Sequence, residues 1–192
     1  MTPNALAVRE MIERVIELTR TYAIWWQLVE KSNFDRYSRV IESHEDFFAA
    51  TTHSLFQGFI VIACLLFEKK ENTISLRSLV DVLAFTDSTS AQRLQTDIEG
   101  KWHLLKKVIP IRGNVYAHRN KFRPPEAFFN AAGLTSNEMR EILDLARDVV
   151  SALAESAGIE PRADIEEEIR RREENSREDT QRIMEALEKH AH

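Results

Sequence analysis

The sequence predicts an all-α protein, and three observations carry that prediction. Glycine and proline number only five each in 192 residues, too few for a turn-rich β fold. Apolar residues recur three and four positions apart along most of the chain, as they do on the buried face of a helix. They make up 43% of the sequence, which is enough for a sizeable core and excludes a disordered or fibrous chain. We therefore expect a helical bundle over residues 1–160, with a charged C-terminal helix or tail over 161–192.

Two long helices are expected in the N-terminal third. The first spans residues 5–31, and the polar stretch KSNFDRYSR closes it. The second is expected to begin near Ser43, which could cap it with Asp46 three positions on, and to run to about Lys70. It becomes apolar on all sides towards its end, and this pattern indicates the central helix of the core.

In the middle of the chain, the sequence predicts a short helix capped by Ser75. A longer helix is expected from about Ala91, after the capping residues of TDSTS. Proline inside a helix kinks or restarts it, so we expect the stretch that follows Pro110, residues 111–123, to open a new helical segment. The longer helix carries the clearest apolar stripe of the protein, which consists of Leu94, Ile98, Trp102, Leu105 and Ile109.

The C-terminal third predicts two more helices of different character. Thr135 and Glu138 have the spacing of a capping box, and Gly158 marks the end of the helix that they open. In residues 164–182, 13 of 19 residues are charged, with both signs interleaved at helix-supporting spacings. A segment with so few apolar residues is not expected to form much core. It is either a solvated helix or tail, or a helix that docks on a subunit or partner.

Composition limits the classes of function. The net charge of −5 argues against a protein that coats nucleic acid with its whole surface, but it allows a local basic site. The single cysteine, Cys64, lies in an apolar run and is expected to be buried. One cysteine cannot form a disulfide within the chain, which fits a reducing cytoplasm. No signal-peptide pattern is present, and the longest apolar run, residues 59–67, is short of a membrane span. We expect a soluble cytoplasmic protein without a membrane partner.

The tryptophans and histidines suggest no cofactor chemistry. Trp102 is expected in the core because it lies on the apolar stripe. Trp25 and Trp26 are adjacent and must point in different directions, so one of them could be exposed at a dimer or partner interface. The histidines other than His118 form no metal-binding pattern, and no phosphate-binding glycine loop is present. We expect no metal and no cofactor.

Positive charge gathers in residues 101–123, where no aspartate or glutamate occurs. The rest of the chain therefore carries −12, which is the net charge of −5 less the seven positive charges of this segment. Such segregation fits a surface that contacts phosphate, and a merely solvated basic face is the alternative. The seven cations are Lys101, Lys106, Lys107, Arg112, Arg119, Lys121 and Arg123.

Within this segment, an arginine and a histidine could together cleave RNA without a metal. A histidine can take a proton from a ribose 2′-hydroxyl near neutral pH, and a guanidinium can hold the phosphate that is cleaved. Asn114 and His118 are four residues apart and should share a helical face, with Lys121 on the next turn. Arg112 lies roughly 120° round the helix from His118. The long arginine side chain could bend round, because Gly113 loosens the backbone, or a second subunit could complete the site. A structural histidine is the alternative.

The stretch IRGNVYAHRNK resembles the signature of the HEPN superfamily, an arginine and a histidine separated by four to six residues. Arg112 and His118 occupy the two positions. Upstream, SHEDFFAATTHSLFQGFIVIACLLFEKKENTISLRSLVDVL is similar to the AbiU-type abortive-infection branch, with its Phe-Phe helix start, its Leu-Phe-acid helix end and its Thr-Ile-Ser-Leu segment. The resemblance covers roughly residues 15–150. Gly113 stands where the signature usually has a polar residue, and Asn114 could take that role from one position along.

The resemblance implies an up-and-down bundle of four or five helices that dimerises and sets two Arg–His pairs at one cleft. Many members are metal-independent endoribonucleases of toxin–antitoxin or phage-defence systems, and an antitoxin or other protein partner is then expected. Arg112 would grip the phosphate and His118 would transfer the proton. The alternative is a catalytically silent module that binds RNA or a protein partner. We expect Asn114 and Tyr116 to shape the site and the remaining cations to guide RNA, namely Arg119, Lys121, Arg123, Lys106 and Lys107.

Overall fold

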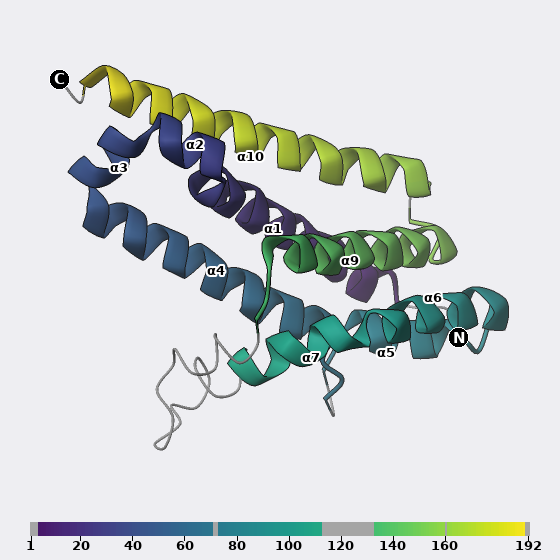
Figure 1. The fold of residues 1–192 in the computed structure, drawn as a ribbon. Helices are drawn as coiled ribbons and strands as arrows, with labels where there is room; N and C mark the ends of the chain where they lie inside the picture. Colours follow the sequence, from purple (N-terminus) through teal and green to yellow (C-terminus); the bar gives the residue numbers. More distant parts are fainter. Residues whose placement is uncertain (1–3, 71–72, 113–132, 160, 191–192) are drawn as a thin grey trace.

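The computed structural model describes residues 4–70, 73–112, 133–159 and 161–190, and these residues form helices without any strand (Figure 1). The predicted all-α class is therefore confirmed. The helices are α1 (Ala5–Val29), α2 (Lys31–Arg36), α3 (Ser38–Ser43), α4 (Glu45–Phe67), α5 (Leu76–Leu83), α6 (Ser88–Gly100), α7 (Trp102–Ile111), α9 (Ser136–Ser156) and α10 (Arg162–His190).

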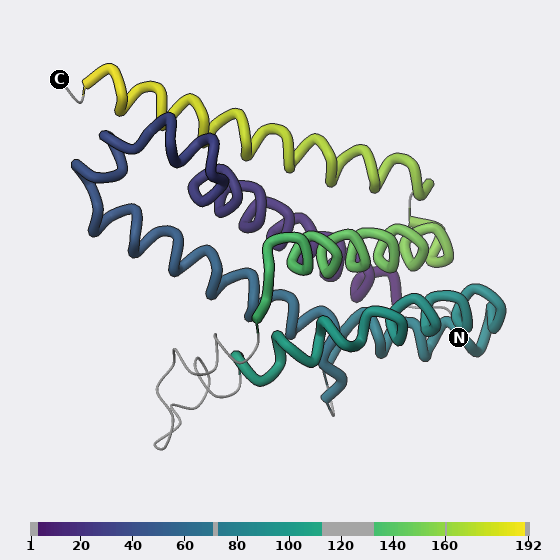
Figure 2. Tube along the Cα trace, in the orientation of Figure 1, coloured from purple at the N-terminus to yellow at the C-terminus, as the bar shows by residue number. Residues whose placement is uncertain are grey.

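Four long helices form the body of the bundle, and α1 lies at its centre. α1 packs against α4, α9 and α10. Figure 2 shows that α4 and α9 run in the opposite direction to α1 and α10, which is an up-and-down arrangement. The shorter α5, α6 and α7 form a layer that covers the C-terminal half of α4 and one side of α9.

The central helix is α1, so the prediction that the second long helix is central was wrong. Eleven of the 25 residues of α1 are buried, and ten of them lie on one half of the helix surface, from which α1 reaches α4, α9 and α10. In α4 the all-round apolar character is confined to the C-terminal half. Among residues 45–58 only Phe48 is buried.

α4 is also the one helix among the described residues whose length and composition would suit a membrane span. In this structure its C-terminal half packs against α1 and α7, and Phe59, Ile60 and Leu66 are fully enclosed there. The buried half of α4 thus serves as a core helix of the bundle.

The helix boundaries follow local signals at three predicted positions. The side chains of Ser75 and Thr135 accept hydrogen bonds from the backbone N–H groups of Ser78 and Glu138, and both form capping boxes. Gly158 follows the end of α9 with φ of 63°, a left-handed conformation that costs glycine little. These predictions are confirmed.

One predicted boundary was wrong. The stripe from Leu94 to Ile109 lies on two helices, α6 and α7, which separate at Lys101 directly after the weak helix former Gly100. Pro110 lies inside the last turn of α7, and the new segment expected after it falls mostly outside the described residues. The hydrogen bond lost at Pro110 is tolerated because Val108 and Ile111, on either side, are buried in the core.

The polar stretch after α1 was expected to be a connection, but it forms the short helices α2 and α3. Ser43 does not cap α4. It is the last residue of α3, and its hydroxyl donates to the carbonyl of Arg39. The residue before α4 is His44, which makes no side-chain capping bond. The side chain of Glu30 instead caps α2, where it accepts from the backbone N–H of Asn33.

The aromatic residues near the C-terminal end of α1 lie against the core. Trp25 and Trp26 are both half-buried, so the expected exposure of one of them is not found. Trp25 packs near Phe56, and Trp26 stacks on Tyr22. Trp102 is half-buried too, with the guanidinium of Arg77 4.5 Å from its ring centre.

The charged C-terminal segment packs along the bundle as α10. Ile165 and Ile169 join the main core, and Met184 joins a second core with Phe48 of α4, while Ile183 is 60% exposed. Only two apolar residues are buried within residues 164–182, so the expectation that this segment forms little core is confirmed. Its docking surface lies on its own chain. The domain division at residue 160 stays a prediction.

One buried carboxylate ties α10 to α9. Glu173 is only 5% exposed and accepts hydrogen bonds from Arg140 at 2.6 Å, from Arg147 at 2.5 Å and from Arg177. Burial alone would raise the pKa of Glu173. The hydrogen bonds and charges of Arg147 and Arg140 outweigh that effect, so its pKa is lowered below the usual 4.5.

We predict that Glu173→Gln lowers the free energy of unfolding by about 3 kcal/mol at pH 7, because it leaves Arg147 and Arg140 with only the half-exposed Asp144 as a counter-charge. The pKa of Glu173 is depressed in the folded state, so its stabilisation is complete above about pH 4.5 and is lost as the pH falls through the lower folded pKa. Urea unfolding from pH 7 to pH 3 would measure both effects. Glu178→Gln, which alters an exposed pair with Arg182, is the control and should change little. Equal effects of the two substitutions would contradict the prediction.

Candidate functional site

Arg112 directly follows α7, and its side chain is held by a carboxylate at the end of α4. Its Nη1 donates to Oε2 of Glu68 at 2.7 Å, and the two side chains are 24% and 23% exposed. Glu68 follows the last residue of α4, and its backbone N–H bonds to the carbonyl of Cys64. α4 and α7 pack against each other, so their C-terminal ends bring the two residues together.

The electrostatics of the two helix ends favour this pairing. A helix C-terminus carries partial negative charge, which stabilises the cation of Arg112 and disfavours the anion of Glu68. Two cations offset that cost, because Oε1 of Glu68 also lies 3.2 Å from Nζ of Lys70. A guanidinium has forked N–H donors, so Arg112 can bond Glu68 with one and a phosphate oxygen with others.

The other described cations of the basic segment do not form a one-sign surface. Nζ of Lys107 donates to Glu138 at 2.5 Å and to the carbonyl of Gly133 at 3.2 Å, and Lys101 pairs with Glu141. The hydrogen bond from Lys107 and the bonds from Thr135 lower the pKa of Glu138.

Of the four cations in residues 101–112, only the exposed Lys106 has no ion pair within the described part of the chain. The expected positive field is therefore largely neutralised in this half of the segment. Acids that are distant in sequence are brought to it by α4 and α9. The RNA-guiding roles of Lys106 and Lys107 stay predictions.

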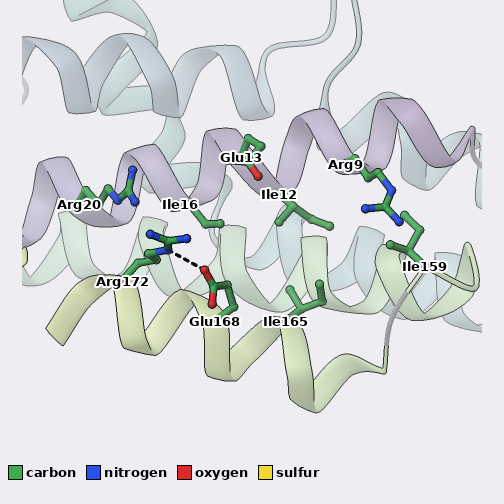
Figure 3. Close-up of a pocket in the computed structure, with 9 residues that line it drawn as sticks. All are labelled: Arg9, Ile12, Glu13, Ile16, Arg20, Ile159, Ile165, Glu168 and Arg172. Carbon is green, nitrogen blue, oxygen red and sulfur yellow. Dashed lines mark hydrogen bonds and ion pairs between the residues drawn. The ribbon is translucent and has the colours of Figure 1, made fainter. Parts of the chain in front are cut away.

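Arginines also gather in a hollow of about 280 Å³ between α1 and α10, which Figure 3 shows in close-up. Arg9 lies at one end of the hollow and Arg20 and Arg172 at the other, over a floor of isoleucines. Glu13 and Glu168 also line it, so its charge is mixed. Its lining, like the described surroundings of Arg112, consists of arginines and carboxylates beside apolar residues.

No group of three or more His, Cys, Asp or Glu side chains suited to a metal ion occurs within the described ranges. In that part of the chain the site around Arg112 is built from arginine, lysine and carboxylate groups.

A model of the HEPN AbiU2 family matches residues 7–175. The chain belongs to this family. It is therefore a HEPN-type module of an abortive-infection family. The curated proteins and solved structures compared with the chain include no significant match. The resemblance found in the sequence is confirmed, and the match reaches further than the expected residues 15–150, into the first half of α10.

The structure places only one half of the HEPN signature. Arg112 is described, while His118 and the supporting Asn114 and Tyr116 lie outside the described residues, as do Arg119, Lys121 and Arg123. Their predicted roles stay predictions. Lys106 and Lys107 lie on α7, on the turns before Arg112.

Sequence reasoning missed Glu68 as a partner of the signature arginine. The signal was present, because an acid directly follows the Leu-Phe end of the apolar helix. Nothing in the sequence joined that acid to Arg112, which is 44 residues away. Only the packing of α4 against α7 makes the connection.

We predict that Glu68→Gln destabilises the protein by about 1–2 kcal/mol, because a partly buried charged hydrogen bond to Arg112 is weakened. Lys70→Ala should cost little, since the Lys70 side chain is about half exposed (49%) and its ion pair is screened by water. Urea unfolding of both variants would compare them. A larger loss in Lys70→Ala than in Glu68→Gln would show that Arg112 is not the main partner of Glu68.

The thiol of Cys64, one helical turn before Glu68, should be inert in the folded protein. Burial, and to a smaller extent the nearby charge of Glu68, raise its pKa to about 12. At pH 8 the thiolate fraction is then on the order of 10⁻⁴. We predict that a disulfide reagent such as Ellman's labels native protein very slowly, and that it labels one thiol per chain at once in guanidinium. Labelling of native protein within minutes would contradict this prediction.

Proposed function

We propose that the protein is a metal-independent endoribonuclease of the HEPN type that acts in abortive infection. The observation that carries the proposal is the placement of Arg112. The signature arginine of the family is partly exposed at the end of α7, and a carboxylate from α4 holds its guanidinium. A guanidinium held in this way can receive a phosphate without a large loss of side-chain entropy.

In the proposed reaction His118 takes the proton of a ribose 2′-hydroxyl, and the 2′-oxygen attacks the adjacent phosphorus. The bond from phosphorus to the 5′-oxygen breaks, and the departing oxygen takes up a proton. The products are a 2′,3′-cyclic phosphate and a 5′-hydroxyl. Arg112 stabilises the charge that grows on the phosphate oxygens. The reaction requires no metal or cofactor.

Glu68 is proposed as a positioning residue for Arg112. It holds the guanidinium through one carboxylate oxygen and binds Lys70 through the other. Arg112 and His118 do not share a helical face by spacing, so we propose that the nuclease acts as a homodimer whose two copies complete the site. An antitoxin or another protein partner in the cytoplasm would restrain it.

A catalytically silent module that binds RNA or a protein partner is the second candidate. The pairing of Lys101 and Lys107 with acids of α9 favours the form of it that binds a protein partner, because the pairing weakens the local positive field that would attract RNA. Gly113 in place of the usual polar residue favours the silent module as well.

We predict that purified protein cleaves RNA in EDTA, and that Arg112→Ala and His118→Ala each lower the rate at least about 100-fold. The rate of cleavage of a labelled RNA, with mapping of its product ends, is the measurement. Lys106→Ala is the matched control, because it removes a cation of the same segment that has no ion pair among the described residues. It should weaken RNA binding, with a smaller effect on the maximal rate.

Three outcomes separate the candidates. Loss of cleavage in both signature variants, together with 2′,3′-cyclic ends, supports the nuclease. Binding of RNA without cleavage by the wild type on several RNAs supports the silent module. Cleavage that survives in both variants places the active site elsewhere.

A further inference from the structure

The N-terminal half of α4 is poorly covered by the rest of the bundle. Phe48 is its only buried residue between positions 45 and 58. The neighbouring Phe47 is 62% exposed, and its ring meets that of Phe48 edge-on at 5.3 Å. Figure 1 shows this half of α4 at the same end of the molecule as α2 and α3. Burial of exposed aromatic side chains is a main source of affinity at protein interfaces.

A groove of about 540 Å³ opens between this half of α4, the short helices α2 and α3, and the end of α1. Its apolar lining includes Leu28, Phe34, Ile41 and Phe48, of which Phe34 is 47% exposed. Leu28 and Phe48 are buried in the second core, so the base of the groove is formed by packed side chains.

The charges of the groove have one sign. Glu42 from α3 and Glu45 from α4 line it, and no cation does. Neither glutamate has an ion pair within the described part of the chain, although most acids of α10 have one. An apolar floor with unpaired carboxylates is complementary to an apolar segment flanked by lysine or arginine.

A second copy of the chain fits this groove poorly. In a symmetric dimer the same patch faces itself, so Glu42 and Glu45 would meet their own counterparts. Like charges placed together at an interface cost free energy. The walls of the groove are helices, and no sheet edge exists among the described residues to receive a strand. A helix laid into the groove is the binding mode that remains.

We propose that this groove docks a basic amphipathic helix of another protein. Its apolar side chains would enter between Phe34 and Phe48, and its lysines or arginines would pair with Glu42 and Glu45. The groove lies at the far end of α4 from Glu68 and Arg112, roughly 24 Å away along the helix from Thr52. The proposal is therefore independent of the nuclease activity, and a bound partner need not cover the candidate catalytic site.

The test uses the full chain and two labelled synthetic helices, each about 18 residues long. Both carry leucine on one face, and the other face carries lysine in one peptide and glutamate in the other. Fluorescence anisotropy would measure the affinity of each peptide. We expect the lysine peptide to bind at least about tenfold more tightly than the glutamate peptide, and to weaken as salt is added.

Three variants locate the binding. Ala49→Trp fills the groove without changing a charge, and it should weaken binding of the lysine peptide at least about tenfold. The double variant Glu42→Lys/Glu45→Lys should reverse the preference between the peptides. Glu17→Lys/Glu99→Lys changes the net charge equally at exposed positions outside the groove, and it should leave the preference intact. Thermal unfolding would confirm that each variant is folded.

Three results would overturn the proposal. Equal effects of the two double reversals, or an unchanged affinity in Ala49→Trp, would show that the peptide responds to overall charge and not to the groove. A wild-type dimer that Ala49→Trp converts to monomer in sedimentation would show that a second copy fills the groove.

Discussion

The burial of α1 is the interaction on which the rest of the structure depends. α4, α9 and α10 all pack on this one helix, and residues such as Val8, Val15 and Leu18 are completely enclosed by them. A helix that packs against three others fixes the positions of its neighbours, because close-packed side chains tolerate little displacement. The ends of α4 and α9, which carry the groups that face Arg112 and Lys107, are held in place by this packing.

Charged groups then meet across helices that are distant in the sequence. Glu68 from α4 reaches Arg112, and Glu138 from α9 reaches Lys107. Lys101, Lys107 and Arg112 of the basic segment are thus each paired with a different carboxylate. Such an arrangement suits stabilisation of a single phosphate at close range more than long-range attraction of RNA, because paired charges give a weak field at a distance.

The two ends of α4 have different environments, and this difference separates the two proposed activities in space. Its C-terminal half is covered by α1 and α7 and ends at Glu68. Its N-terminal half is exposed and borders an acidic apolar groove. α10 borders the same end, since Met184 packs with Phe48, and its buried Glu173 fixes it to α9. α10 therefore supports the floor of the groove from its inner side.

Local patterns in the sequence determined the helical class, the capping boxes at Ser75 and Thr135, the turn at Gly158 and the burial of Cys64, because each depends on residues close together in the chain. The HEPN signature was readable for the same reason. The tertiary structure alone decided that α1 is central, that α10 is part of the bundle and that Glu68 holds Arg112. Those outcomes depend on which surfaces bury the most apolar area together and on which charges that packing brings within bonding distance. Neither quantity is a property of a short stretch of chain.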